Sequence, residues 1–96
     1  MSTVKEDLLK AAALIEEEGW CRGKYLNADG QRCVLGALSD VTADLPVDTD
    51  RRLRRAINHL KRGLNITVAL VEWNDDPRRT KDEVFAALHA AAEVAS

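Results

Sequence analysis

The sequence is poor in aromatic residues, in cysteine and in long apolar runs. Only Trp20, Tyr25, Trp73 and Phe85 are aromatic in a chain that is 46% hydrophobic, so aliphatic side chains must fill most of the interior, which favours helices. Two cysteines are too few for a secreted disulfide framework, and no stretch approaches the roughly 18 apolar residues that cross a membrane. The first ten residues carry no apolar signal region. We therefore expect a cytoplasmic protein with no membrane partner.

Length and charge set further limits. A chain of 96 residues can bury roughly 60–65% of the surface that it exposes when unfolded, so we expect one compact domain over residues 1–96. The net charge is −2, but residues 1–50 carry 5 Lys and Arg against 10 Asp and Glu, while residues 51–96 carry 9 against 6. The two halves are therefore oppositely charged, at −5 and +3.

The first helix is predicted by signals at both of its ends. Thr3 stands three residues before Glu6, which is the spacing of a capping box, and Gly19 can supply a left-handed stop. The apolar residues between them recur at helical spacing: Val4, Leu8, Ala11, Ala12 and Ile15. We expect Trp20 to fold back onto this stripe.

A β-hairpin is predicted after the first helix. Asp29-Gly30 is a dipeptide that favours a tight two-residue turn, and apolar residues flank it on both sides. This register does not place Cys21 opposite Cys33, which argues against a disulfide or a shared metal between them.

Three further helices follow from apolar periodicity. In residues 34–45 the apolar stripe is Val34, Leu38, Val41 and Leu45, and Pro46 follows it. In residues 48–64 the stripe is Leu53, Ile57, Leu60 and Leu64, with Gly63 as the expected stop. In residues 80–95 a second capping box, Thr80 to Glu83, precedes the stripe Val84, Phe85, Leu88, Ala92 and Ala95. Residues 65–73 suit either a strand or a helical turn, and we favour the extended form. The sequence thus predicts a mainly α fold, with about four helices in a small bundle and a short β-hairpin between the first two.

Cys33, at the start of a helix, is a candidate nucleophile. A helix N-terminus stabilises a thiolate, and Cys33, His59 and Asn74 or Asp75 occur in the chain order of some cysteine hydrolases and transferases. However, helical geometry turns His59 about 130° away from the apolar stripe of its helix. We therefore favour a packing role for Cys33, on a narrow side shared with Gly36 and Ala37, and a non-enzymatic protein. The Cys and His spacings match no structural zinc site, so we expect no metal and no cofactor.

The third predicted helix is densely basic. Its cationic residues are Arg51, Arg52, Arg54, Arg55, Lys61 and Arg62. We favour a solvated face that is partly paired with the acidic half of the chain, the run Glu16-Glu17-Glu18 being one candidate partner. A nucleic-acid-binding accessory role is the alternative, and the same helix could dock on an acidic protein.

The segments GWCRG, CVLGAL and WNDDPRRTKDEV, in this order, resemble a small, functionally uncharacterised domain family of actinobacteria and their bacteriophages. The resemblance covers about residues 5 to 93 and is carried by Trp20, Gly23, Cys33, Gly36, Ala37, Trp73, Asn74, Asp75, Thr80 and Val84. It implies a cytosolic setting and a phage or actinobacterial origin, but no activity, substrate or catalytic residue. Cys21 and the Arg-rich helix lie outside the pattern.

From the residues themselves, Trp73, Asn74 and Asp75 are predicted to form a structural corner. A polar pocket for a small ligand, formed with Trp20 and the Cys33 loop, is the alternative. From these observations we predict a small regulatory or interaction protein. Its partner would be a host protein, if the gene is phage-encoded, or another copy of itself. The candidate binding residues are Trp20, Cys33, Trp73, Asn74, Asp75, Arg51, Arg52 and Arg55.

Overall fold

The computed structural model describes residues 3–43 and 48–95, and within them the chain forms helices and no strand. The helices are α1 (Val4–Glu18), α2 (Val34–Thr42), α3 (Thr49–Leu64), α4 (Leu70–Asp75) and α5 (Lys81–Val94). The prediction of a mainly α bundle is confirmed, although the described residues form five helices rather than four.

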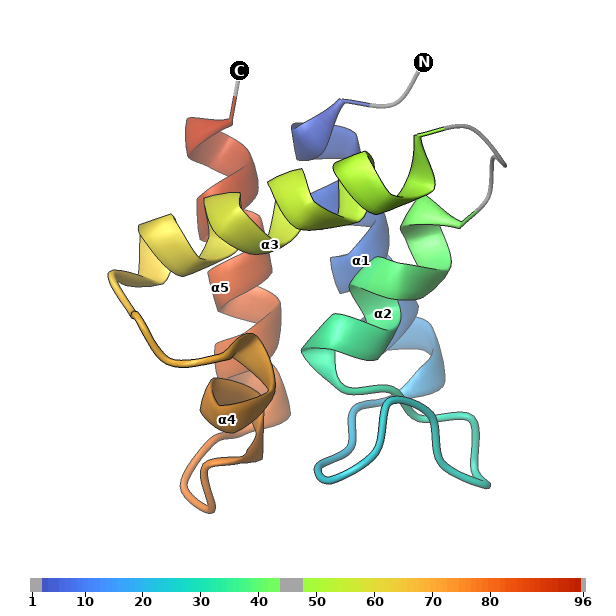
Figure 1. Cartoon of the computed structure of the whole chain (residues 1–96). Helices are drawn as coiled ribbons and strands as arrows, with labels where there is room; N and C mark the ends of the chain where they lie inside the picture. Colours follow the sequence, from blue (N-terminus) through green and yellow to red (C-terminus); the bar gives the residue numbers. More distant parts are fainter. Residues whose placement is uncertain (1–2, 44–47, 96) are drawn as a thin grey trace.

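The helices pack around one apolar core. α1 and α5 lie side by side, α2 packs against α1, and α3 crosses the outer side of the bundle (Figure 1). The core is aliphatic, as the shortage of aromatic residues predicts, and its largest fully buried apolar side chains are Leu8, Ile15, Leu38, Leu60, Leu88, Val34 and Val84. The apolar stripes of α1, α2 and α5 therefore face the interior as predicted, and Leu45 and Pro46 lie outside the described residues.

Both predicted capping boxes begin their helices. The Thr3 hydroxyl accepts a hydrogen bond from the Glu6 N–H at 3.1 Å, and the Thr80 hydroxyl accepts one from the Glu83 N–H at 3.2 Å. Gly19 ends α1 with φ of 98°, a backbone conformation that glycine adopts without steric cost. The ends of α1 and the start of α5 are therefore determined by local sequence.

The predicted β-hairpin is wrong. Residues 19–33 form a compact loop, here called the α1–α2 loop, whose ladder consists of isolated bridges from Arg32 to Trp20 and to Leu26. The turn is built by Asn27, whose side-chain oxygen accepts hydrogen bonds from the N–H groups of Asp29 and Gln31. Of the Asp29-Gly30 pair, only Gly30 has a positive φ, so the two-residue hairpin turn does not form.

The end and the buried side of α3 also differ from the prediction. The helix continues through Gly63 and stops at Asn65, which is left-handed with φ of 56° and whose N–H is bonded to the carbonyls of Arg62 and Lys61. The buried residues are Arg52, Ala56 and Leu60, whereas Leu53, Ile57 and Leu64 are only half-buried. Residues 70–75 are helical as α4 instead of extended, because Leu70, Trp73 and Asn74 turn toward the interior at helical spacing.

Candidate functional site

Asn74, in α4, is a buried hydrogen-bond hub. Its side chain is fully buried, and its oxygen accepts hydrogen bonds from the Trp20 indole N–H at 2.7 Å and from the Val34 N–H at 2.9 Å. Its amide nitrogen donates to the Cys21 carbonyl at 3.1 Å and to the Asp75 carboxylate at 3.0 Å. All four bonds of the Asn74 amide are therefore made. Because the Val34 N–H belongs to the first turn of α2, Asn74 also satisfies a donor that the helix leaves open.

Asp75 and Arg22 complete the connection between the α1–α2 loop and the segment after α4. The Asp75 carboxylate accepts a hydrogen bond from the Gly23 N–H at 3.0 Å. Arg22 lies over the Trp20 ring, 4.7 Å from its centroid, and donates to the carbonyls of Asp76 and Pro77, each at 3.2 Å, and of Arg79. The predicted corner thus joins two segments that are about fifty residues apart in the chain.

Trp73 is the apolar part of the same corner. Its side chain is buried against the core, and the Arg79 guanidinium lies 4.2 Å from the centroid of its ring while donating to the Trp73 carbonyl at 3.0 Å. The structure therefore brings Trp20, Trp73, Asn74, Asp75 and the Cys33 loop together. Their polar groups are directed at one another, so the residues act as a structural hub.

Cys33 is a helix cap and a packing residue. It is 1% exposed, and its sulfur accepts a hydrogen bond from the Gly36 N–H at 3.3 Å. A Cβ at Gly36 would lie 2.1 Å from the Tyr25 carbonyl oxygen, so the small-residue side of α2 receives the α1–α2 loop at close range. Burial raises the pKa of the Cys33 thiol, and the Gly36 and Leu35 N–H groups offset only part of that increase.

The other members of the hydrolase alternative lie in different surroundings. The His59 Nε2 is 3.1 Å from the Ala91 carbonyl of α5, and the Asn74 amide is fully used by the hub. Burial also raises the pKa of Cys21, whose thiol donates to the Lys24 and Gln31 carbonyls, and both cysteines are free. No hydrogen bond among the described residues connects either thiol to a histidine that could act as a base.

A cleft opens beside the α1–α2 loop. It has a volume of about 510 Å³ and is lined by Gly23, Lys24, Tyr25, Leu26, Cys33, Val71 and Asp75. Tyr25 is 61% exposed and Leu26 is 54% exposed, so two adjacent large side chains of this loop are open to solvent. The bridge between Leu26 and Arg32 is made by the neighbouring residues: the Tyr25 carbonyl accepts from the Cys33 N–H, and the Asn27 N–H donates to the Gln31 carbonyl. In the described structure, the Leu26 backbone N–H and carbonyl themselves therefore form no hydrogen bond. We call residues 24–28 the Leu26 edge; Leu26 is the bridge residue of this largely exposed segment, and Ala28 already lies in the turn.

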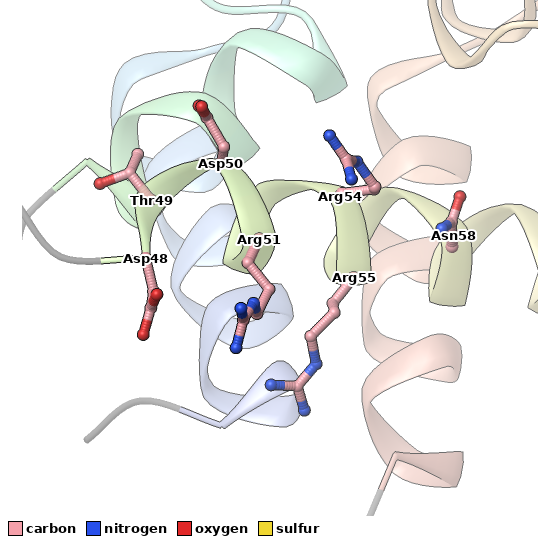
Figure 2. Close-up of a pocket in the computed structure, with 7 residues that line it drawn as sticks. All are labelled: Asp48, Thr49, Asp50, Arg51, Arg54, Arg55 and Asn58. Carbon is pink, nitrogen blue, oxygen red and sulfur yellow. The ribbon is translucent and has the colours of Figure 1, made fainter.

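The basic side of α3 carries a second concave surface. Its volume is about 510 Å³, and it is lined by Asp48, Thr49, Asp50, Arg51, Arg54, Arg55 and Asn58. Along the exposed side of the helix, Arg51 and Arg55 extend toward one margin and Arg54 toward the opposite margin (Figure 2). An adjoining hollow of about 320 Å³ shares Arg55 and Asn58 and adds His59 and Arg62. We call the set Arg51, Arg54, Arg55, Asn58 and Arg62 the arginine face.

Arg52 does not belong to that face, contrary to the prediction. It is 8% exposed and donates to the Asp7 carboxylate at 2.8 Å, and Asp7 itself is 1% exposed. The guanidinium also donates to the carbonyls of Thr42 and Val41 at the end of α2. The acidic partner of the basic helix in α1 is therefore Asp7, since the described ion pairs of the chain do not include the Glu16 to Glu18 run.

Sequence reasoning missed two features of the site. The sequence predicts Leu26 in one arm of a hairpin; the signal for the observed loop is Asn27, a turn former that directly follows Tyr25-Leu26. The burial of Arg52 has only a weak sequence signal, which is the position of Asp7 directly before Leu8 in the apolar stripe of α1. Among the described residues, no group of three or more His, Cys, Asp and Glu side chains could hold a metal ion, and no helix is long and apolar enough to cross a membrane.

The fold and the site define a small helical domain whose long loop is locked by a buried asparagine and which carries an apolar cleft and an arginine face. The family model named DUF6197, described as a family of unknown function, matches residues 1–94, and the chain belongs to this family. No match was found among curated proteins or among solved structures.

Proposed function

We propose that the protein is a small interaction protein that associates with a second copy of itself through the Leu26 edge. The observation that carries the proposal is the open backbone of Leu26 beside two exposed apolar side chains and the cleft. An exposed strand edge with unpaired N–H and carbonyl groups is a template for a further extended segment.

The charges of this edge favour a second copy as the occupant. In an antiparallel pairing centred on Leu26, the two Leu26 residues exchange both of their hydrogen bonds. Lys24 of each copy then approaches the turn of the other copy that carries Asp29, and both charged side chains are exposed. Tyr25 and Leu26 of each copy cover the apolar lining of the other. An extended segment of a host protein would offer the same backbone groups but not this charge symmetry.

The resemblance to a family of actinobacteria and bacteriophages extends this proposal to a cellular setting. We infer a regulatory role in the bacterial cytoplasm, and in the host cytoplasm where the gene is carried by a phage. Since the edge is short, we expect a weak association that responds to protein concentration.

The test is sedimentation velocity from about 10 μM to 1 mM protein. We expect the average mass to rise toward that of a dimer, and Leu26→Lys to abolish the rise, because the substitution places two like charges opposite each other in the paired edge. Val94→Lys is the matched control, since Val94 is 70% exposed and lies at the end of α5. A monomer at all concentrations, or equal effects of the two substitutions, would refute the proposal.

A further inference from the structure

α3 is an outer helix of the bundle with one buried side. It follows α2 directly in the chain, and in Figure 1 it runs across the outer side of α1 and α5 at a steep angle to α2. Only Arg52, Ala56 and Leu60 of its 16 residues are buried, so the opposite side is open to solvent over the helix length of about 24 Å.

That open side concentrates positive charge in a chain whose net charge is −2. Within residues 3–43 and 48–95, Arg51, Arg54, Arg55 and Arg62 form no ion pair, and all four are exposed. Asp48 and Asp50 flank only the start of the helix. Since Asp7 neutralises Arg52 in the interior, the remaining guanidinium groups create a local field that would orient an approaching polyanion.

The spacing of these residues suits a duplex. Arg51, Arg54, Arg55 and Asn58 stand at i, i+3, i+4 and i+7, which is the set that the first turns of a recognition helix direct at base edges. An α-helix fits the major groove, where arginine pairs with guanine and asparagine with adenine. Arg62, one turn further along the same side, would reach a phosphate.

Other polyanions fit this face less well. The arginine face has no aromatic side chain on which the bases of a single strand could stack. An extended acidic peptide has no groove to receive the helix, whereas the base edges of a duplex also offer partners to the Asn58 amide. The exposed side of α3, with an asparagine among its arginines, is instead a helix surface of the kind that the major groove of a duplex receives.

We propose that the arginine face of α3 binds double-stranded DNA in the major groove. This inference is independent of self-association, because the α1–α2 loop and α3 lie at opposite ends of the molecule (Figure 1). A dimer formed through the Leu26 edge would hold its two arginine faces far apart and would leave both of them open.

The test is fluorescence anisotropy with a labelled 20-base-pair duplex of mixed sequence, titrated with the protein at 50 mM and at 200 mM salt. We expect binding in the micromolar range at the lower salt and a loss of at least about tenfold at the higher, as phosphate contacts by several arginines require. The double variant Arg54→Ala/Arg55→Ala should weaken binding at least about tenfold and flatten the salt dependence, while its thermal melting stays that of the parent.

Arg78→Ala/Lys81→Ala is the control, since it removes the same charge from the turn before α5 and the start of that helix. It should change duplex affinity by less than about twofold. The proposal is overturned by the absence of duplex binding at 100 μM protein and 50 mM salt, or by equal losses in both double variants. It is also overturned by tighter binding of the single strand alone or of a poly-glutamate peptide.

Discussion

At the residue scale, the hub depends on the amide of Asn74, because that single buried group satisfies two donors and two acceptors from other parts of the chain. Replacing Asn74 by alanine leaves the Val34 N–H and the Trp20 indole without partners in a buried site. Each orphaned group costs about 1–3 kcal/mol, so we expect Asn74→Ala to lower the free energy of unfolding in urea by about 2–4 kcal/mol.

The control for this prediction is an asparagine that has no buried bonds. Asn58→Ala, on the exposed side of α3, should change the free energy of unfolding by less than about 0.5 kcal/mol. Aspartate at position 74 should not rescue the loss. It keeps the two accepted bonds but places a second carboxylate oxygen against the Cys21 carbonyl and the Asp75 carboxylate. A loss below about 1 kcal/mol for Asn74→Ala would show that the loop holds without the hub.

At the scale of elements, α2 and α3 each contain a glycine. Replacing these two glycines by alanine should change the free energy of unfolding in opposite directions. Gly36→Ala would place a Cβ 2.1 Å from the Tyr25 carbonyl oxygen, so the α1–α2 loop must move away from α2. We expect the substitution to lower the free energy of unfolding by at least about 2 kcal/mol and to expose Cys33 to alkylation.

Gly63→Ala is the matched substitution for that prediction. Its Cβ would lie 3.8 Å from the Ala91 Cβ, which is an ordinary van der Waals contact, and Gly63 sits inside the helix. Alanine there should raise the free energy of unfolding by about 0.5–1 kcal/mol, because glycine loses more backbone entropy in a helix. Chemical denaturation of both variants measures the contrast, and equal signs would contradict the described packing of α2 against the loop.

Elements with signals in their own sequence could be predicted, and the others could not. The capping threonines Thr3 and Thr80 gave the starts of α1 and α5, because a cap needs only residues three apart. α4 was missed because six residues form a helix there only when Trp73 and Asn74 are buried by other segments. The α1–α2 loop differs from the predicted hairpin for the same reason. Arg32 bridges to both Trp20 and Leu26, and these contacts hold the loop without a two-residue hairpin turn.

At the scale of the whole molecule, the sequence names the residues of the hub but does not predict the hydrogen bonds between them. The segments that carry the resemblance contain Trp20, Cys33, Asn74 and Asp75, and the structure brings them together. Which atoms meet depends on contacts between residues about forty to fifty positions apart, which periodicity does not report. The buried side of α3 illustrates the limit, because the contacts that set Arg52 apart from its exposed neighbours include Asp7, 45 residues earlier, and the last carbonyls of α2.

The Asp7 and Arg52 pair joins three helices, since Arg52 of α3 also donates to the last carbonyls of α2 while Asp7 lies on α1. Removing one partner leaves a buried charge, so Asp7→Leu and Arg52→Met should each lower the free energy of unfolding by about 3–5 kcal/mol. The double variant should lose at least about 2 kcal/mol less than the sum, because neither charge is then stranded. Arg78→Met, whose side chain is 91% exposed, should change the stability by less than about 0.5 kcal/mol. Additive losses in the cycle would show that the two charges do not stabilise each other, and the contribution of Arg52 would then come from its bonds to the α2 carbonyls.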